Sequence, residues 1–184
     1  MRIDWKTISL EDLAGLLSEE LRKKGIEIIL VGGACVTIYS KNRYQSYDLD
    51  FVTYEDLSKV KQTLKLLNFE ESSGYFRHKN CPWIVEFVSP PVAVGDEPIT
   101  KFSKRKTDMG TVKMLRAIDS IKDRLASYYH WEDRQGLEQA VDICLEVPKI
   151  NFNELKRWSK NEGYLEKFQQ FLSFFKEQKK KYRG

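Results

Sequence analysis

The chain has 184 residues, of which 41% are hydrophobic, and its formal net charge at pH 7 is +4. This composition argues against disorder and supports one sizeable core. The longest apolar run, 26–39, is interrupted by Glu27 and is shorter than the roughly 20 residues that a membrane-spanning helix needs. A charged first segment and three cysteines without CxxC spacing argue against a signal peptide, a disulfide framework and a zinc site. We therefore expect a soluble, cytoplasmic protein that does not contact membranes.

The first part of the chain, up to residue 67, predicts helices that alternate with short strands. Ser9 and Asp12 predict a capping box, and apolar residues at helical spacing continue the helix until Gly25. The segment 26–31 is short and β-rich, which predicts a buried strand, and a short helix is expected over 34–40 after the Gly32-Gly33 turn. The alternation over 47–52 predicts a second strand, and Thr53 with Asp56 predicts the cap of a second helix.

The rest of the chain predicts a hairpin and then helices. Segments 75–78 and 82–88 are expected to pair as a hairpin, and 111–115 as a last strand. Helices are expected over about 119–130, 133–146, 152–161 and 163–182. This order predicts an α/β (α+β) fold, in which a mixed sheet with flanking helices forms a domain over 1–116. A helical C-terminal bundle is expected over 117–184.

Positive charge is unevenly distributed along the chain. Residues 149–184 contain 10 Lys or Arg and 4 Asp or Glu, and residues 101–116 contain 6 and 1. The remainder is acidic, with 15 basic and 22 acidic residues. An acidic body with two basic segments suits a site that gathers metal ions and a surface that meets polyanions. The alternative is that the Lys-rich end is only a solvated helix end.

Three carboxylates carry the chemical hypothesis. Asp48 and Asp50 are two residues apart on a predicted strand, so their side chains point to one face, and Glu86 lies in an otherwise apolar strand. Like charges held close favour a cation between them, and Mg²⁺ prefers oxygen ligands. Gly32 and Gly33 follow a buried strand, where backbone amides can approach a phosphate. Taken singly, each pattern also fits an exposed strand face or an ordinary tight turn.

Taken together, these motifs resemble the nucleotidyltransferase superfamily, which includes DNA polymerase beta and the minimal nucleotidyltransferases. The matching segments are VGGACVTIYSKNRYQSYDLDFV at 31–52, in which 14 residues separate Gly33 from Asp48, and VEF at 85–87. Residues 120–143 are similar to the helical part of the AbiEii-like branch, where a lysine is implicated in nucleotide binding and a later aspartate in catalysis. Lys122 and Asp133 occupy those places, although a helix surface of mixed charges also explains them.

The resemblance implies an Mg²⁺-dependent (or Mn²⁺-dependent) nucleotidyltransferase that moves a nucleoside monophosphate from an NTP to an acceptor hydroxyl. It implies catalytic Asp48, Asp50, Glu86 and Asp133, of which the first three bind metal, and nucleotide-binding Gly32, Gly33, Ser46 and Lys122. RNA, such as a tRNA end, is the expected acceptor, as in the toxins of that branch, and an antitoxin-type protein is an expected partner. Two alternatives are a catalytically silent binding or regulatory module of the same fold, and a structural nucleic-acid-binding protein.

Overall fold

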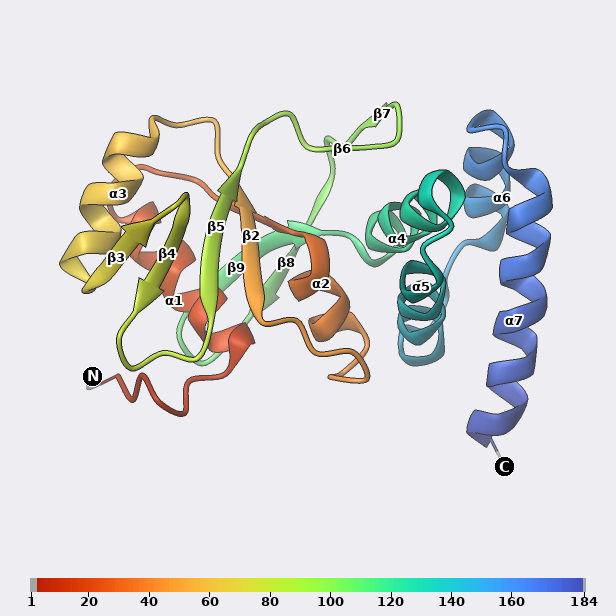
Figure 1. Cartoon of the computed structure of the whole chain (residues 1–184), viewed down its shortest axis with the longest axis horizontal. Coiled ribbons are helices and arrows are strands. Elements are labelled where there is room, and N and C mark those ends of the chain that lie inside the picture. The colour runs from red at the N-terminus through yellow and green to blue at the C-terminus, as the bar shows by residue number, and fades with distance from the viewer. Residues whose placement is uncertain (1–2, 184) are drawn as a thin grey trace. The chain divides into compact units, whose positions relative to one another are not determined.

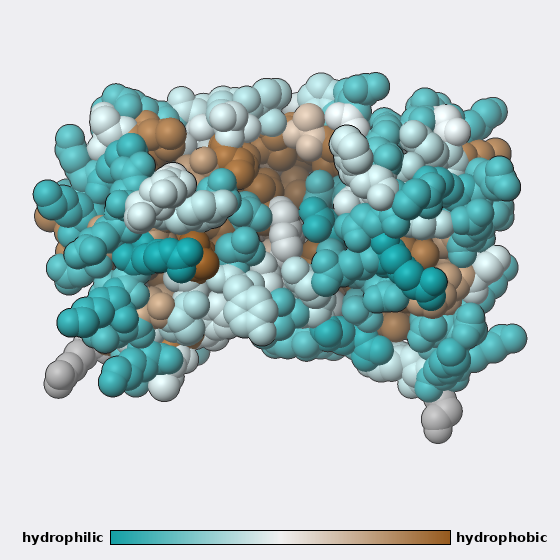
Figure 2. Space-filling view, viewed as in Figure 1, coloured by the Kyte–Doolittle hydropathy of each residue, from teal (hydrophilic) through white to brown (hydrophobic). Residues whose placement is uncertain are grey.

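The computed structural model describes residues 3–183, which form two compact units (Figure 1). The first unit comprises 3–35, 46–92 and 101–115, and the second comprises 36–45, 93–100 and 116–183. No helix in the described part of the chain is long and apolar enough to cross a membrane. Hydrophilic residues cover most of the face shown in Figure 2, and hydrophobic residues form separate patches between them. The assignment of catalysis to 1–116 stays a prediction.

A mixed sheet of seven strands forms the first unit, in the order β3-β4-β5-β2-β1-β9-β8. The bounds of these strands are β1 (Ile29–Val31), β2 (Asp48–Val52), β3 (Phe69–Ser72), β4 (Tyr75–His78), β5 (Ile84–Val88), β8 (Phe102–Lys106) and β9 (Thr111–Leu115). Strand β2 pairs antiparallel with β1 and parallel with β5, while β4 and β5 form the predicted antiparallel hairpin. The central strands carry the core, because Leu30, Leu49 and Phe51 are fully buried.

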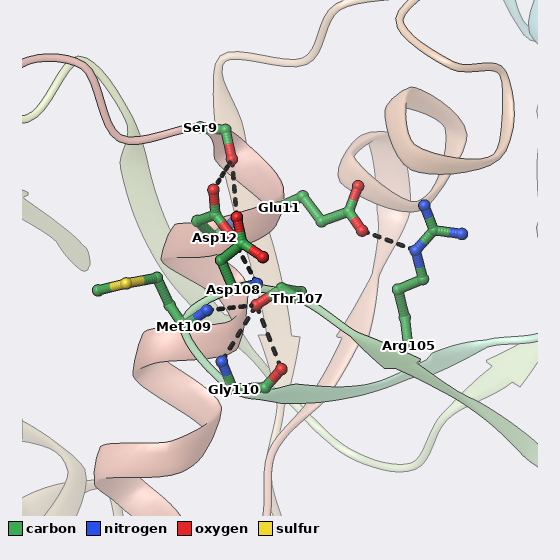
Figure 3. Close-up of polar contacts among 8 residues, drawn as sticks. All are labelled: Ser9, Glu11, Asp12, Arg105, Thr107, Asp108, Met109 and Gly110. Atoms are coloured by element: carbon green, nitrogen blue, oxygen red, sulfur yellow. Dashed lines mark hydrogen bonds and ion pairs between the residues drawn. The ribbon is translucent and has the colours of Figure 1, made fainter.

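Helices α1 (Leu10–Arg22) and α3 (Leu57–Leu66) belong to the same unit. The capping box that begins α1 is confirmed, because the Ser9 hydroxyl accepts from the Asp12 amide at 3.0 Å and donates to the Asp12 carboxylate at 2.7 Å. Figure 3 shows this cap beside the β8–β9 turn, where the Asp108 amide also donates to Asp12. Helix α3 is capped by Asp56, which accepts from the Ser58 amide at 2.8 Å.

Thr53 was expected to share in the cap of α3, but the structure gives it another role. Its hydroxyl donates to the Glu27 carbonyl at 2.8 Å and so ties the end of β2 to the segment before β1. The helix is capped by the Asp56 carboxylate alone, since it begins at Leu57 and the Asx-type bond from Asp56 reaches the second helical amide.

The second unit is helical and contains one short hairpin. Its helices are α4 (Ala117–Trp131), α5 (Arg134–Glu146), α6 (Phe152–Asn161) and α7 (Leu165–Arg183), and its hairpin pairs β6 (Ala93–Val94) with β7 (Glu97–Pro98). Aromatic side chains fill its core: Tyr129 stacks on Trp158 and on Tyr164, and its hydroxyl bonds to Ser159 at 2.8 Å. The predicted α+β class with a helical C-terminal region is therefore confirmed.

Candidate active site

The junction of β1 and α2 (Gly32–Tyr39) brings backbone and carboxylate together. Strand β1 ends at Val31, and Gly32 has a φ of +66°, a left-handed conformation that favours glycine. A Cβ at Gly32 would collide with Oδ2 of Asp50. Gly33 lies in the helix without positive φ, so the unusual backbone belongs to the first glycine of the pair. The glycine turn therefore allows the Asp50 carboxylate to lie directly against the main chain.

The carboxylates form a row across two neighbouring strands. Asp50 pairs in register with Val31 of β1 on one side and with Glu86 of β5 on the other. Paired residues point to the same face, so Asp50 and Glu86 are neighbours, and Asp48 shares their face two residues earlier. All three side chains are half-buried, whereas Leu49, between the two aspartates, is fully buried. The alternation predicted over 47–52 is seen from Asp48 to Phe51, whereas Val52 is buried and Tyr47, before the strand, is exposed.

Ser46 positions the first of these carboxylates. Its side chain is only 2% exposed, and its hydroxyl donates to Oδ1 of Asp48 at 2.7 Å and to the Asp48 carbonyl at 3.1 Å. A fixed hydrogen bond to one oxygen leaves the other carboxylate oxygen to act as a ligand. The sequence suggested Ser46 only as a nucleotide contact, and that role stays a prediction. The positioning role has a local signal, a serine two residues before the acid.

The donor set fits Mg²⁺. Oxygen atoms from carboxylates are the ligands that this ion prefers, and it usually takes one or two of them together with water and phosphate oxygens. Within residues 3–183 no group of three or more His, Cys, Asp or Glu side chains forms a ready-made metal cluster. Neither Asp48 nor Glu86 forms an ion pair with Lys or Arg among the described residues. These like charges beside the Gly32 turn therefore suit a cation, and the three metal ligands stay a prediction.

Lys122 lies in the second unit and is enclosed by carboxylates. Its side chain is 1% exposed, and its Nζ lies 2.9 Å from Oε2 of Glu97 and 3.3 Å from Oε1 of Glu154. Burial of an ammonium is costly unless it is paired, and these two partners satisfy it. Glu97 stands on β7 and is 48% exposed, so it is the partner that solvent reaches most easily. The nucleotide-binding role of Lys122 stays a prediction, and a phosphate would compete with these carboxylates.

Asp133 caps α5 and does not pair with Lys122. Its carboxylate accepts from the Gln135 amide at 3.0 Å and from the Ser127 hydroxyl at 2.8 Å. Desolvation alone would raise the pKa of Asp133, but the bonds from Ser127, Gly136 and Gln135 and the charge of Arg124 outweigh it, so the pKa lies below its usual value. A carboxylate with a lowered pKa is a weak proton acceptor. The catalytic role of Asp133 stays a prediction, whereas its structural role is to cap the N-terminus of α5.

The structure of this chain is similar to structures of known proteins. No protein-family model matches the chain. An antigenic nucleotidyltransferase-like protein from Paracoccidioides brasiliensis is similar in structure, with a TM-score of 0.59, 16% identity and coverage of 89% of this chain and 93% of that one. The antibiotic-resistance factor ANT(2'')-Ia is similar with a TM-score of 0.50, 13% identity and coverage of 94% and 97%. The chain therefore has the nucleotidyltransferase fold, as the sequence predicted.

One sequence relative is a much longer protein, of which this chain matches only a part. Over 128 residues, 65% of this chain, the sequence is 26% identical to "Uncharacterized protein R369" of Acanthamoeba polyphaga mimivirus. The matched region spans only 27% of that viral protein. These comparisons do not test the AbiEii-like branch, which stays a prediction.

Proposed function

We propose that this chain is an Mg²⁺-dependent nucleotidyltransferase that transfers a nucleoside monophosphate from an NTP to an acceptor hydroxyl and releases pyrophosphate. The observation that carries the proposal is the row of Asp48, Asp50 and Glu86 on one face of β2 and β5, against the Gly32 turn, in a nucleotidyltransferase fold. Nucleotidyl transfer needs positioning and charge compensation more than covalent chemistry by the protein; the carboxylate row would supply the first, and the cation that it holds would supply the second.

Each residue of the row has a defined task in the proposed reaction. Asp48, oriented by Ser46, and Asp50, which lies against Gly32, would hold the metal through their carboxylate oxygens. Mg²⁺, when bound there, offsets the negative charge of the triphosphate. The acceptor oxygen attacks the α-phosphorus and the bond to pyrophosphate breaks, while Glu86 either completes the metal site or accepts the proton that the hydroxyl loses. The start of α2 presents main-chain amides suited to phosphate oxygens.

RNA, such as a tRNA end, is the acceptor that we favour, and the resemblance to the AbiEii-like branch adds a toxin-like role with an antitoxin-type partner. Its support is charge placement. On the exposed faces of α6 and α7, Lys156, Arg157, Lys160, Lys176 and Lys180 have no ion-pair partner among the described residues. Unpaired cations on a helical surface bind a polyanion by releasing its counterions.

The test is transfer of label to RNA. The chain is incubated with each NTP labelled at the α-phosphate, Mg²⁺ and total RNA, and label in the RNA is measured. Transfer by the native chain and its loss in Asp48→Asn with Asp50→Asn would support the proposal. Glu70→Gln, an exposed carboxylate on β3 outside the row, is the matched control and should transfer normally.

Two other outcomes have clear meanings. Mg²⁺-dependent NTP binding without transfer to any RNA or small hydroxyl compound would favour the catalytically silent binding module instead. Transfer that survives the double substitution would contradict the assignment of the reaction to this carboxylate row.

A further inference from the structure

A cavity of about 490 Å³ opens in the first unit away from the carboxylate row. It lies among the C-terminal half of α1, the segment before β1, and strands β8 and β9. Its lining residues are Ser18, Glu19, Arg22, Gly25, Ile26, Glu27, Ile28, Lys104, Thr111 and Lys113. None of them belongs to the candidate active site. Its volume is in the range of small-molecule sites, roughly 300–1,000 Å³.

Two lysines stand side by side in the lining of this cavity without enough negative charge to match them. Lys104 of β8 and Lys113 of β9 are directly opposite in the antiparallel register, so both side chains point to the same face. Lys113 bonds to Glu27 at 2.6 Å, but Lys104 has no hydrogen-bond or ion-pair partner among the described residues. Like charges directly opposite each other are destabilising. An anion between the two ammonium groups would remove that repulsion.

The acidic groups of the lining are already engaged. Glu19 pairs with Arg22 at 2.6 Å, and Glu27 pairs with Lys113. The three basic and two acidic side chains leave a surplus of one positive charge, which Lys104 carries. Glu27 is 71% exposed, so its bond to Lys113 is weak and an incoming dianion can replace it.

Uncharged residues complete a site for the rest of a ligand. Ile26 and Ile28 are buried and give the cavity an apolar floor. The Thr111 hydroxyl, at the start of β9, is exposed and has no hydrogen-bond partner among the described residues. A ligand with hydroxyl groups beside its charge matches this lining.

We propose that this cavity binds a small phosphomonoester, with its phosphate between Lys104 and Lys113 and its hydroxyl-bearing body over Ile26 and Ile28. A phosphomonoester carries close to two negative charges at neutral pH, so it can engage both lysines at once. The proposal is independent of nucleotidyl transfer, because the site shares no residue with the carboxylate row.

The experiment is a titration of the full chain with glycerol 3-phosphate, followed by backbone amide NMR shifts at 0.15 M NaCl without Mg²⁺ or NTP. Saturable shifts are expected at Ile26, Thr111 and Lys113, and glycerol alone should give none. Lys104→Gln should weaken binding about tenfold, because one charge-assisted contact is lost. Lys106→Gln, an exposed lysine on the same strand outside this cavity, is the matched control and should change affinity by less than about twofold.

Four results would overturn the proposal. Shifts that rise without saturation, or an equal effect of Lys104→Gln and Lys106→Gln, would mean that glycerol 3-phosphate meets only diffuse surface charge. Shifts confined to Gly32 and Gly33 would place the phosphate at the glycine turn instead. Lys113→Gln is a second variant that must also weaken binding, and normal amide spectra of each variant confirm that it folds.

Discussion

Replacing Gly32 by alanine tests the link between the glycine turn and the carboxylate row. The substitution adds one methyl group at a residue whose φ is +66°, directly against the Asp50 side chain. Two penalties combine there, a backbone penalty and a contact penalty. The chain offers a control that separates them, because Gly25 has a φ of +75° and an added Cβ would meet nothing within 4 Å.

The expected magnitudes follow from these two environments. A left-handed backbone costs a non-glycine residue about 1–2 kcal/mol, so Gly25→Ala should lower the free energy of unfolding by about that amount. At Gly32 the new Cβ would also overlap the Asp50 carboxylate, whose Cγ lies 3.3 Å away. Overpacking of this kind adds about 1–3 kcal/mol. Gly32→Ala should therefore destabilise the chain by about 2–5 kcal/mol.

Urea unfolding measures the free energy that the contact between the new Cβ and Asp50 costs. The four variants are Gly32→Ala, Gly25→Ala, Asp50→Ala and Gly32→Ala with Asp50→Ala. Asp50→Ala removes the carboxylate, so in that background Gly32→Ala should cost no more than Gly25→Ala does. Because Asp50 must move in Gly32→Ala, calorimetry should also show weaker Mg²⁺-dependent NTP binding, which Gly25→Ala leaves unchanged. Equal destabilisation by Gly32→Ala and Gly25→Ala in the native background would refute the reasoning, because the overlap with Asp50 would then add nothing to the cost.

Three further predictions concern the remaining charged groups. Asp48→Asn with Asp50→Asn should abolish the NTP binding that EDTA also abolishes in the native chain, and unchanged calorimetric binding would disprove the metal site. Asp133→Ala should cost about 1–2 kcal/mol by loss of the helix cap, whereas Asp133→Asn retains the cap. Because the folded-state pKa of Asp133 is lowered, its charge contributes stability above its unfolded pKa, and native stability should fall with pH below about 4 more steeply than that of Asp133→Asn. Removal of 176–184 should lower RNA affinity and its salt dependence but not NTP affinity, and an unchanged salt slope would mean a solvated helix end.

Much of the fold could be predicted from local patterns. The strands over 75–78 and 111–115 and the helix over 152–161 have the expected bounds, because apolar periodicity and turn residues define them. The sequence did not predict β3, whose residues FEES contain a single apolar side chain, or β8, whose residues FSKRK are mostly basic. Both are edge strands of the sheet, each paired on one side only. Charged side chains, especially lysine, are common on such strands because they discourage pairing with other chains.

The site could be predicted only in part. The period of two along a strand places Asp48 and Asp50 on one face, and the sequence was sufficient for that. The register that sets Asp50 beside Glu86 depends on a parallel pairing between distant segments, which no local pattern specifies. The partners of Lys122 are equally distant, since Glu97 and Glu154 come from a two-residue strand and from another helix.

Charge pairing across the sheet gives both proposed sites a common physical basis. Where β3 and β4 pair, an exposed acid faces an exposed base, Glu70 opposite Arg77, so the two charges offset each other. Like charges face each other in register at two other places, Asp50 with Glu86 and Lys104 with Lys113. Each like-charge pair costs stability to the extent that opposite charge does not offset it, and beside Lys113 the exposed Glu27 offsets it only weakly. The same sheet is therefore expected to gather a cation at β2 and β5 and an anion at β8 and β9, so each ligand should raise the melting temperature without the other.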